Sequence, residues 1–378
     1  MKIAMLSPYS LSRLGGVQGQ VLGLARSLRT LGHEVTVIGP EDPEERKLTD
    51  DSDDEGPGER FVMGRPTGLR SNGSVAPVTI SPVAAMRAER FVRKGGFDVL
   101  HLHEPLAPVA SYGFVATAPL PMVGTYHRAG VSRWVPVLKP LVMLVGSRLQ
   151  VRVAVSEAAR ETALRSSKGE YEVLFNGVDM DRFAKGEPVR AEVPTVLFLG
   201  RHETRKGLGG LLDAFAAIER PAVLWVAGDG PQGEVQRRRH PESDRVKWLG
   251  VLSNREVDAR LMGADVLCAP SLRGESFGMV VLEGMAARCS VVASDLQGYR
   301  SAAGGHAILV PPGDVQALSR ALGVALADAA EGSGHSSVDA LKAAETHAQG
   351  WSMESLAERY VDVYERAIAI YHGRRGGS

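Results

Sequence analysis

The chain has 378 residues, 44% of them hydrophobic and 23% charged, with 44 Lys and Arg against 44 Asp and Glu. This length is comfortable for two globular domains, and the zero net charge gives no support to a nucleic-acid partner. Cys268 and Cys289 lie in apolar runs and no stretch reaches signal-peptide or transmembrane length, so we expect a cytoplasmic protein with reduced thiols and no zinc site.

The N-terminal residues predict a parallel βαβ unit. Lys2–Ser7 is an apolar strand, a loop with Gly15 and Gly16 follows, and Gln20–Leu31 has the apolar spacing of a helix. Glu34–Ile38 is a second strand. Such a series is typical of a doubly wound α/β domain, in which the glycines let the backbone approach another group closely.

Residues 41–60 are dense in acidic side chains and are expected to form a solvated loop. The D-x-D spacing of Asp51 with Asp53, and of Asp179 with Asp181, also occurs in metal motifs. Within a charge run and at a turn, we interpret these side chains as solvent-facing and capping residues.

A basic amphipathic helix is predicted from Pro82 to about Lys94. Its cations recur at steps of three and four residues and gather on one side: Arg87, Arg90, Arg93 and Lys94. Two interpretations stay open. The helix lies on an anionic membrane surface, or its cations face solvent.

Three histidines lie at or near the ends of predicted strands. His101 and His103 belong to the strand that begins at Phe97, and His127 comes just after the strand Pro121–Thr125. Open α/β sheets bind ligands beyond the carboxyl ends of their strands. His127 is therefore the better functional candidate, whereas His101 alternates with apolar residues as a core residue does.

A second α/β series begins after a linker at residues 184–194. The predicted strand Thr195–Leu199 leads into a loop that carries three cations, Arg201, Arg205 and Lys206. Cations beyond a strand end suit an anion, and an Arg fork with a Lys point charge suits phosphate oxygens.

The stretch around residues 272–283 is the centre of the second series. An apolar strand ends at Pro270, and the chain passes through Gly274 and Gly278 into an apolar helix, with Glu275 in the loop and Glu283 about two turns into the helix. A helix start offers backbone N–H groups to polar ligands. Carboxylates cannot grip a diphosphate but accept bonds from sugar and ribose hydroxyls.

These residues together favour sugar transfer from a nucleotide sugar over glycoside hydrolysis. A glycosidase needs a carboxylic acid to protonate a poor leaving group, whereas a nucleoside diphosphate leaves readily once its charge is stabilised by cations. Arg201, Gly228-Asp229-Gly230 and the E-x7-E segment from Glu275 to Glu283 resemble the retaining glycosyltransferases of family 4. That family has the GT-B fold, two Rossmann-like doubly wound domains around a cleft.

Further motifs resemble the actinobacterial members of that family that mannosylate phosphatidylinositol. These motifs are Pro8-Tyr9-Ser10, Gly15-Gly16-Val17-Gln18, Asn72–Ala76, Val99–Pro105 and Gly274–Gly278. The resemblance implies GDP-mannose as donor, phosphatidylinositol as acceptor, and a peripheral position on the inner face of the plasma membrane. It also implies front-face transfer with no required metal or other cofactor.

The resemblance also implies a role for individual residues. It implies that the donor diphosphate is bound by Gly16, Arg201 and Lys206, with Arg205 beside them. It implies that the sugar is bound by Glu275 and by the backbone of Ser276, Phe277, Gly278 and Met279. Glu283 holds the ribose, Leu252, Ser253 and Asn254 face the base, and His127 lies beside the transferred sugar. The acceptor falls to Tyr9, Gln18, Asn72, Gly73 and Ser74, and the membrane to Arg87, Arg90, Arg93 and Lys94.

The chain departs from the family pattern at three places. Ser71 and Pro77 replace a Tyr and an Arg that flank the acceptor motif, and Val257 replaces a Lys expected near the base. Three rivals stay open: a family 4 enzyme with a UDP-sugar or another acceptor, a nucleotide-sugar isomerase or epimerase that uses His127 with Glu275, and a peripheral membrane protein without catalysis.

The expected domain organisation has an acceptor domain at residues 1–170, a donor domain at residues 171–350 and a last helix. Residues 351–371 carry apolar side chains at helical spacing. We expect this helix, within 351–378, to cross back onto the first domain.

Overall fold

The computed structural model describes residues 1–12, 16–42, 60–71, 74–78, 81–107, 114–115, 117–128, 139–183, 186–275 and 277–375. The chain forms two compact units, one of Met1–Gly177 with Met353–Ser378 and the other of Val178–Ser352. The boundaries expected at residues 170 and 350 thus lie at residues 177 and 352 in the structure. Residues 41–60 were expected to be a solvated loop, and 43–59 of these lie outside the described residues.

The first unit is built on a parallel sheet with the order β3-β2-β1-β6-β7-β8-β9. β1, β6 and β7 are fully or almost fully buried, as expected for parallel strands that helices cover on both faces. The strands are β1 (Lys2–Leu6), β2 (Glu34–Gly39), β3 (Arg60–Val62), β6 (Val99–His103), β7 (Met122–Tyr126), β8 (Val151–Ala154) and β9 (Glu172–Val173).

The helices of the first unit begin and end close to the predicted residues. The predicted basic helix has the same bounds as α3, and the Ser81 side chain accepts from the N–H of Ala84 at its start. The helix expected from Gln20 begins at Gly16 instead, so Gly16 lies in the first turn rather than in a loop. The helices are α1 (Gly16–Thr30), α3 (Pro82–Lys94), α5 (Lys139–Arg148) and α6 (Glu157–Ser166).

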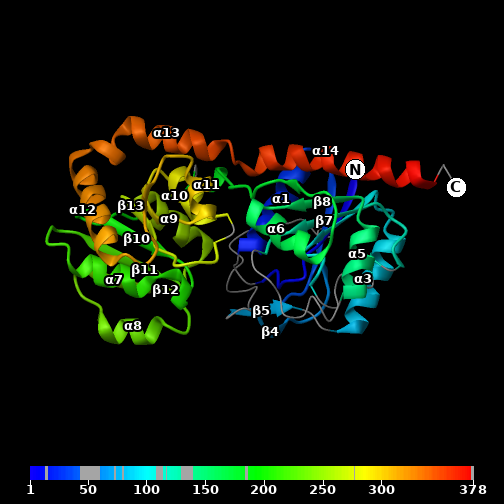
Figure 1. The fold of residues 1–378 in the computed structure, drawn as a ribbon, viewed down its shortest axis with the longest axis horizontal. Helices are drawn as coiled ribbons and strands as arrows, with labels where there is room; N and C mark the ends of the chain where they lie inside the picture. The colour runs from blue at the N-terminus through cyan, green and yellow to red at the C-terminus, as the bar shows by residue number, and fades with distance from the viewer. Residues whose placement is uncertain are drawn as a thin grey trace. The chain divides into compact units, whose positions relative to one another are not determined.

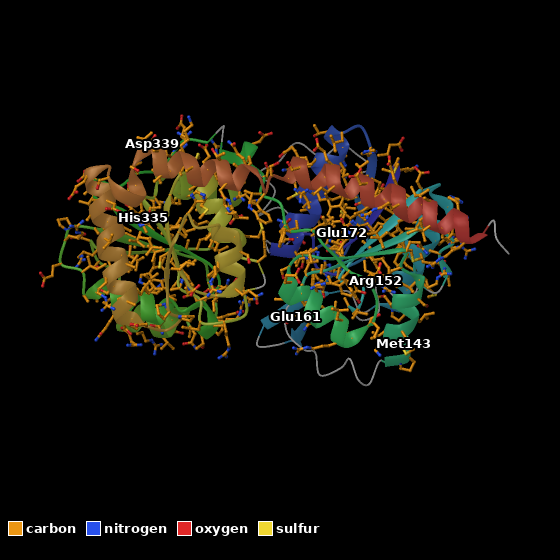
Figure 2. The ribbon with its side chains drawn as sticks, turned by 45° about the horizontal axis from the view of Figure 1, so that its top comes forward. Met143, Arg152, Glu161, Glu172, His335 and Asp339 are labelled. Carbon is orange, nitrogen blue, oxygen red and sulfur yellow. The ribbon has the colours of Figure 1, made fainter. Side chains whose placement is uncertain are left out.

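A hairpin and the last helix complete the first unit. The hairpin β4 (Thr67–Ser71) with β5 (Ser74–Val78) is antiparallel and separate from the main sheet. The last helix, α14 (Met353–Arg375), packs along α1 and against β6, β7 and β8 (Figure 1). Arg366 of α14 also forms an ion pair with Glu172 of β9, which is labelled in Figure 2.

The second unit repeats the plan with a sheet of order β12-β11-β10-β13-β14-β15. All its neighbouring strands are parallel. The strands are β10 (Thr195–Leu199), β11 (Val223–Ala227), β12 (Val246–Gly250), β13 (Val266–Ala269), β14 (Ser290–Ser294) and β15 (Ile308–Val310). The helical segments are η1 (Asp181–Phe183), η2 (Thr204–Lys206), α7 (Leu208–Ala216), α8 (Gly233–Arg239), α9 (Asn254–Gly263), α10 (Met279–Ala286), α11 (Gln297–Ala303), α12 (Val315–Glu331), η3 (Gly334–Ser336) and α13 (Val338–Gln349).

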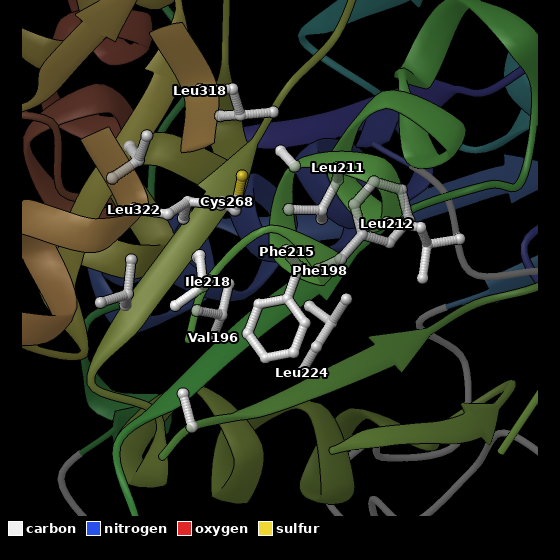
Figure 3. Close-up of a cluster of buried hydrophobic side chains, with 14 of the residues drawn as sticks. Val196, Phe198, Leu211, Leu212, Phe215, Ile218, Leu224, Cys268, Leu318 and Leu322 are labelled. Carbon is white, nitrogen blue, oxygen red and sulfur yellow. The ribbon is translucent and has the colours of Figure 1, made fainter. Parts of the chain in front are cut away.

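One core of the second unit lies where the strands meet α7 and α12 (Figure 3). Alternate residues of β10, Val196 and Phe198, point to the same side of the sheet and join Leu211 and Phe215 of α7 and Leu322 of α12. These side chains are at most 2% exposed, and burying each of them contributes roughly 1.5–3 kcal/mol before chain entropy is subtracted. The core therefore fixes the strand ends from which the candidate site extends.

Both sheets have a topological switch point. In the first unit the chain adds strands on one side of β1 and then returns to add β6 on the other, and β10 and β13 stand in the same relation in the second unit. Loops that leave the carboxyl ends of such a strand pair diverge and open a crevice for a ligand. Every candidate residue that the sequence placed beyond β1, β6, β10 or β13 therefore lies at a position suited to binding.

Candidate functional site

In the second unit, two loops meet beyond the switch point. The loop after β10 and the loop after β13 are joined by a hydrogen bond from the N–H of Leu272 to the carbonyl of Arg205, at 2.7 Å. Gly207 ends the first loop with φ of +73°, and a Cβ there would lie 2.0 Å from the carbonyl oxygen of Pro270. Only glycine allows this close approach, which brings the cations of one loop to the carboxylate of the other.

Glu275 lies at the centre of a cluster of polar side chains. Its Oε1 atom accepts hydrogen bonds from Lys206 Nζ at 2.7 Å, Ser271 Oγ at 3.0 Å and Arg205 at 3.2 Å. The Glu275 side chain is only 11% exposed, and charge-assisted bonds of this kind are among the strongest in proteins. The carboxylate and the two cations therefore neutralise one another in the structure.

Glu203 extends this cluster on its other side. Its carboxylate forms ion pairs with Arg201 at 3.2 Å and with Arg205 at 2.8 Å. We name the set of Arg201, Glu203, Arg205, Lys206 and Glu275 the cationic cluster, because its three cations exceed its two carboxylates by one. The excess positive charge suits an anionic ligand, because anionic oxygens form strong charge-assisted hydrogen bonds with Arg and Lys.

The loop before α10 is shaped by a glycine and an aromatic pair. Gly278 has φ of +94°, and a Cβ there would lie 2.6 Å from the ring of Tyr299. The buried Tyr299 hydroxyl bonds Ser271 Oγ at 2.8 Å, and burial together with the Glu275 carboxylate raises the pKa of Tyr299. Phe277 is buried and packs its ring against Trp351, so its side chain belongs to the packing of this unit.

Two predicted donor residues lie at the start of α10. Gly278 is its N-cap and Met279 is its first residue, whereas Ser276, to which the resemblance assigned a backbone contact with the sugar, lies outside the described residues. The backbone N–H groups at this end of α10 carry the positive end of the helix dipole. They are therefore suited to oxygen atoms of a bound sugar or phosphate.

Glu283 belongs to a second group of charges. Its Oε1 atom bonds Arg182 at 3.0 Å, and Arg182 Nε bonds Asp258 Oδ1 at 2.7 Å. Burial opposes the charge of Arg182, but Glu283 and Asp258 together raise its pKa. Burial raises the pKa of Asp258, whereas Arg182 lowers it. This group could not be predicted from local sequence, because Arg182 and Glu283 are 101 positions apart along the chain.

The loop at residues 252–254 has a structural role of its own. Ser253 begins α9 with a capping box, in which the N–H of Glu256 donates to Ser253 Oγ and the Glu256 carboxylate accepts from the N–H of Ser253. The Ser253 side chain is thus committed to the helix. Leu252 is partly buried and Asn254 is exposed.

In the first unit, a row of buried aromatic and polar side chains lies at the carboxyl ends of β6 and β7. His101 bonds the hydroxyl of Tyr364 at 2.8 Å and Thr125 Oγ1 at 2.7 Å, and Thr125 bonds the hydroxyl of Tyr360 at 2.9 Å. Two tyrosines of α14 thus reach the core beneath the switch point. His101 is a satisfied core histidine, as its alternation with apolar residues predicted.

His103 and His127 form a direct pair. Nδ1 of His103 lies 2.9 Å from Nε2 of His127, so one of these nitrogens carries the proton that the other accepts. Burial lowers the pKa of both residues, that of His127 to about 3, so both are neutral at physiological pH. Nε2 of His103 and Nδ1 of His127 are buried and have no hydrogen-bond partner among the described residues. We name His101, His103 and His127 the histidine row.

Glu104 holds the loop that carries His127. Its buried side chain accepts from the backbone N–H groups of His127 and of Arg128, the latter at 2.9 Å. Burial raises the pKa of Glu104, while these two bonds and Arg128 lower it. Glu104 itself has φ of +48°, a strained value for a residue with a side chain. From the sequence Glu104-Pro105 was interpreted only as a break, so this role was missed.

The predicted acceptor residues are dispersed. Tyr9 follows β1, and burial and the nearby Glu104 carboxylate raise its pKa. Gln18 is buried in the first turn of α1, and Gly16 begins that helix with open space where a Cβ would stand. Asn72 and Gly73 lie outside the described residues, and the backbone of Ser74 pairs with that of Ser71 in the hairpin.

The cations of α3 are all exposed, and the buried side of the helix is apolar. Ala85, Ala88 and Val92 face the core, whereas the exposed surface carries Arg87, Arg90, Arg93 and Lys94 beside Val83 and Met86, which are 60% and 61% exposed. No helix in the described part of the chain is both long and apolar enough to cross a bilayer. Among the same residues, no three His, Cys, Asp or Glu side chains are placed to hold a metal ion.

The chain was compared with known protein families and with curated proteins. The model described as Glycosyltransferase Family 4 matches residues 14–182, and that described as Glycosyl transferases group 1 matches residues 193–328. Phosphatidyl-myo-inositol mannosyltransferase of Mycobacterium tuberculosis is 36% identical over 339 residues, which cover 86% of each chain. The enzyme of that name from Propionibacterium freudenreichii is 32% identical, over 79% of this chain and 78% of its own.

Solved structures share the fold at lower sequence identity. Sucrose-phosphate synthase of Thermosynechococcus elongatus superposes with a TM-score of 0.73 at 22% identity, over 97% of this chain and 99% of its own. Anabaena HepE, solved with UDP and glucose, gives 0.74 at 19% identity over the same shares. The GT-B fold class that the resemblance implied is thereby confirmed.

Proposed function

The chain belongs to glycosyltransferase family 4, and we propose that it transfers mannose from GDP-mannose to the inositol ring of phosphatidylinositol with retention of anomeric configuration. The cationic cluster carries the proposal, because Lys206, Arg205 and Glu275 bring phosphate-binding and hydroxyl-binding groups together at one helix start. The names of relatives that match 86% of the chain support mannose and phosphatidylinositol as the transferred group and the acceptor.

The donor diphosphate binds the cationic cluster by exchange. When its oxygens reach Lys206 and Arg205, they replace the Glu275 carboxylate, which then accepts hydroxyl groups of the mannose. As the bond from the anomeric carbon to the diphosphate breaks, negative charge builds up on the leaving oxygen. The cations stabilise that charge without a proton donor, and Arg201 adds to the field from the edge of the cluster.

Transfer proceeds on one face of the sugar. An inositol hydroxyl forms the new bond to the anomeric carbon on the side from which the diphosphate leaves, and its proton passes to the departing phosphate oxygen. The products are mannosylated phosphatidylinositol and GDP. His127 stays neutral, since burial lowers its pKa to about 3, and acts beside the sugar as a hydrogen-bonding group rather than as a charged acid.

The remaining donor and acceptor contacts follow the family pattern. Glu283 binds the ribose, the loop at residues 252–254 faces the base through its backbone, and Gly16 contributes its backbone to the diphosphate. Tyr9, Gln18 and residues 72–74 face the inositol phosphate. Cations and phosphates need no metal bridge here, so we propose catalysis without a divalent ion.

The exposed surface of α3 brings the protein to the inner face of the plasma membrane. Four cations attract anionic lipids, each by about 1 kcal/mol, and Val83 and Met86 reach the acyl boundary. Replacing Arg87 and Arg90 by Gln should weaken binding to phosphatidylinositol vesicles by tenfold or more, about 2 kcal/mol for the two charges. The matched control is Arg238→Gln on α8, where the Arg is also exposed, and unchanged binding of the double variant would contradict the proposal.

A single assay tests the function. The protein is incubated with phosphatidylinositol vesicles and GDP-mannose, UDP-glucose or UDP-mannose, and the lipid is analysed by mass spectrometry. We expect one hexose on phosphatidylinositol with GDP-mannose only, and none with Glu275→Gln. Transfer from UDP-sugars alone would assign another donor, and conversion of the donor sugar without acceptor would indicate an isomerase or epimerase. Vesicle binding without turnover, unaffected by Glu275→Gln, would indicate a protein without catalysis.

A further inference from the structure

One guanidinium of the second unit lies between carboxylates from two helices. Arg182 of η1 bonds Asp258 of α9 at 2.7 Å through Nε and Glu283 of α10 at 3.0 Å through Nη1. The three side chains are partly buried, with 23%, 13% and 20% of their surface exposed. We name them the carboxylate pair with its arginine. They lie in the same unit as the cationic cluster but share no residue with it.

The charge balance here is opposite to that of the cationic cluster. One cation meets two carboxylates, and the nearby Asp179 carboxylate adds further negative charge, which raises the pKa of Arg182. A surplus carboxylate at a partly exposed position repels phosphate but accepts hydrogen bonds from uncharged hydroxyls. This balance suits the two neutral, hydroxyl-bearing parts of a nucleotide sugar, the hexose and the ribose, and because the hexose is assigned to Glu275, the ribose is left for this group.

The positions of the two carboxylates along the chain point to the same ligand. Asp258 lies in α9, directly after the capped loop at residues 252–254, to which the base is assigned. Glu283 lies in α10, whose start carries the loop with Glu275. Arg182 connects these helices. In a nucleotide sugar the ribose lies between the base and the diphosphate, so a ribose-binding group is required between those two loops.

We propose that Arg182 and Asp258 are positioning residues that aim the Glu283 carboxylate at the ribose hydroxyls and so make the protein select ribonucleotides over deoxyribonucleotides. The proposal rests on the proposed function for the assignment of the ribose to Glu283. Arg182 binds one oxygen of Glu283, and the other oxygen is left to accept a hydroxyl. Asp258 holds the opposite edge of the guanidinium, so that Arg182 cannot turn with Glu283.

The test is the ratio of the dissociation constants of deoxy and ribo nucleotides, measured by calorimetry with GDP, 2′-deoxy-GDP and 3′-deoxy-GDP. For the wild type we expect GDP to bind about tenfold more tightly than at least one deoxy form, because a carboxylate left without its hydroxyl partner is costly. Arg182→Met should reduce this ratio to about two or less, mainly by weakening GDP. Arg182→Lys should keep part of it, since Lys retains the charge but not the fork.

Three controls separate positioning from general damage. Pyrophosphate has no ribose, so its affinity should be the same in the wild type and Arg182→Met. Arg260 belongs to α9, as Asp258 does, but its guanidinium stacks over the ring of Trp225 at 4.4 Å. Arg260→Met therefore removes a cation outside the carboxylate pair with its arginine and should keep the wild-type ratio. In a Glu283→Gln background, Arg182→Met should change the ratio no further, because both substitutions remove the same interaction.

The outcomes distinguish the inference from the proposed function. If Arg182→Met does not fold, Asp258→Asn keeps the shape of the group, and a ratio reduced about two- to threefold supports the inference. An unchanged or larger ratio in a folded variant, with mannose transfer intact in the wild type, overturns the inference alone. If the wild type binds UDP but not GDP, the assignment of the donor fails. The same ratio is then measured with UDP and its deoxy forms, and the inference stands if Arg182→Met reduces it and is overturned if it does not. Binding of neither nucleotide overturns both.

Discussion

Both units carry titratable side chains near equivalent pairs of strands, but the surroundings of these side chains differ. Those of the second unit are paired with opposite charges, whereas those of the first unit are buried without such partners. In the second unit the cationic cluster pairs cations with carboxylates through contacts as short as 2.7 Å at partly exposed positions. In the first unit the histidine row is buried and its rings bond no charged side chain among the described residues, so its members are neutral. Burial without a countercharge disfavours the ionised form, whereas pairing preserves it.

This difference indicates separate roles for the two units in sugar transfer. A paired and partly exposed cluster can exchange its internal partners for a charged ligand at a smaller cost in desolvation than a fully buried one. A buried neutral row cannot supply charge, but it can hold a hydrogen-bonding side chain in one orientation. We therefore infer that the second unit stabilises the leaving diphosphate and that the first unit orients groups around the sugar.

The largest effect is expected from removing one cation of the cluster. Lys206→Met should lower the rate of mannose transfer by about a thousandfold and weaken GDP binding, because the developing phosphate charge loses its closest donor. The measurement is steady-state transfer with a parallel GDP titration. Lys247→Met, which removes an exposed Lys from β12 of the same unit, is the control and should keep wild-type turnover. Near-normal transfer by Lys206→Met would remove the cluster from the mechanism.

A smaller effect is expected from the carboxylate that holds the histidine row. In Glu104→Gln, both backbone N–H groups exchange a charged acceptor for a neutral one, because both donate to Oε1, so the unfolding free energy should fall by about 1–3 kcal/mol. Transfer should also slow while GDP affinity stays unchanged, since Glu104 acts on His127 and not on the donor cluster. Urea denaturation and GDP titration measure the two properties. A variant as stable and as active as the wild type would show that the Glu104 contacts do not position His127.

The neutrality of the histidine row predicts a loss of stability in acid. The pKa values of His101 and His127 fall from 6.5 in the unfolded chain to about 3 in the folded protein, so between these values only the unfolded chain takes up the protons. Stability is therefore complete above pH 6.5 and declines as the pH falls towards 3, by about 1.4 kcal/mol per pH unit for each histidine.

Urea denaturation between pH 7.5 and 5 measures that slope, roughly the range over which an ordinary histidine takes up its proton. His101→Gln should give a shallower dependence of unfolding free energy on pH than the wild type, although it lowers stability at neutral pH by breaking the bonds to Tyr364 and Thr125. Equal slopes for the two proteins would show that His101 carries a proton in the folded state.

Chelation of divalent metal ions is expected to have no effect on the rate of transfer. If the cationic cluster supplies all the charge that the diphosphate requires, transfer rates with EDTA and with added Mg²⁺ should agree within the error of the assay. A rate that falls with EDTA and recovers with Mg²⁺ would mean that the cations need a metal ion in addition.

Much of the fold could be predicted from local sequence. The Pro82–Lys94 helix could be predicted because Pro82 suits its first turn and its cations recur at helical spacing, and in the structure Ser81 caps its start. The strand–loop–helix around Gly274 and Gly278 was predicted for the same kind of reason. Such signals are contained within a few neighbouring residues.

The contacts of the candidate site could be predicted only in part. The residue types indicated phosphates for Lys206 and hydroxyls for Glu275, but not that these side chains bind each other across 69 positions, since that depends on how two loops meet. Glu104 and Arg182 were missed for this reason. Ser253 was assigned to the base although its side chain caps α9, a local signal that the Ser-Asn-Arg-Glu sequence does contain.

The central claim is that Glu275 pairs with Lys206 and Arg205 in the protein without a donor, and that a bound donor replaces these ion pairs. Parallel calorimetric titrations of GDP and GDP-mannose into the wild type and Glu275→Gln test it most directly. Since the substitution frees Lys206 and Arg205 but removes the acceptor for sugar hydroxyls, GDP should bind at least as tightly as to the wild type, while GDP-mannose loses its advantage over GDP. Equal weakening of both ligands would contradict the account.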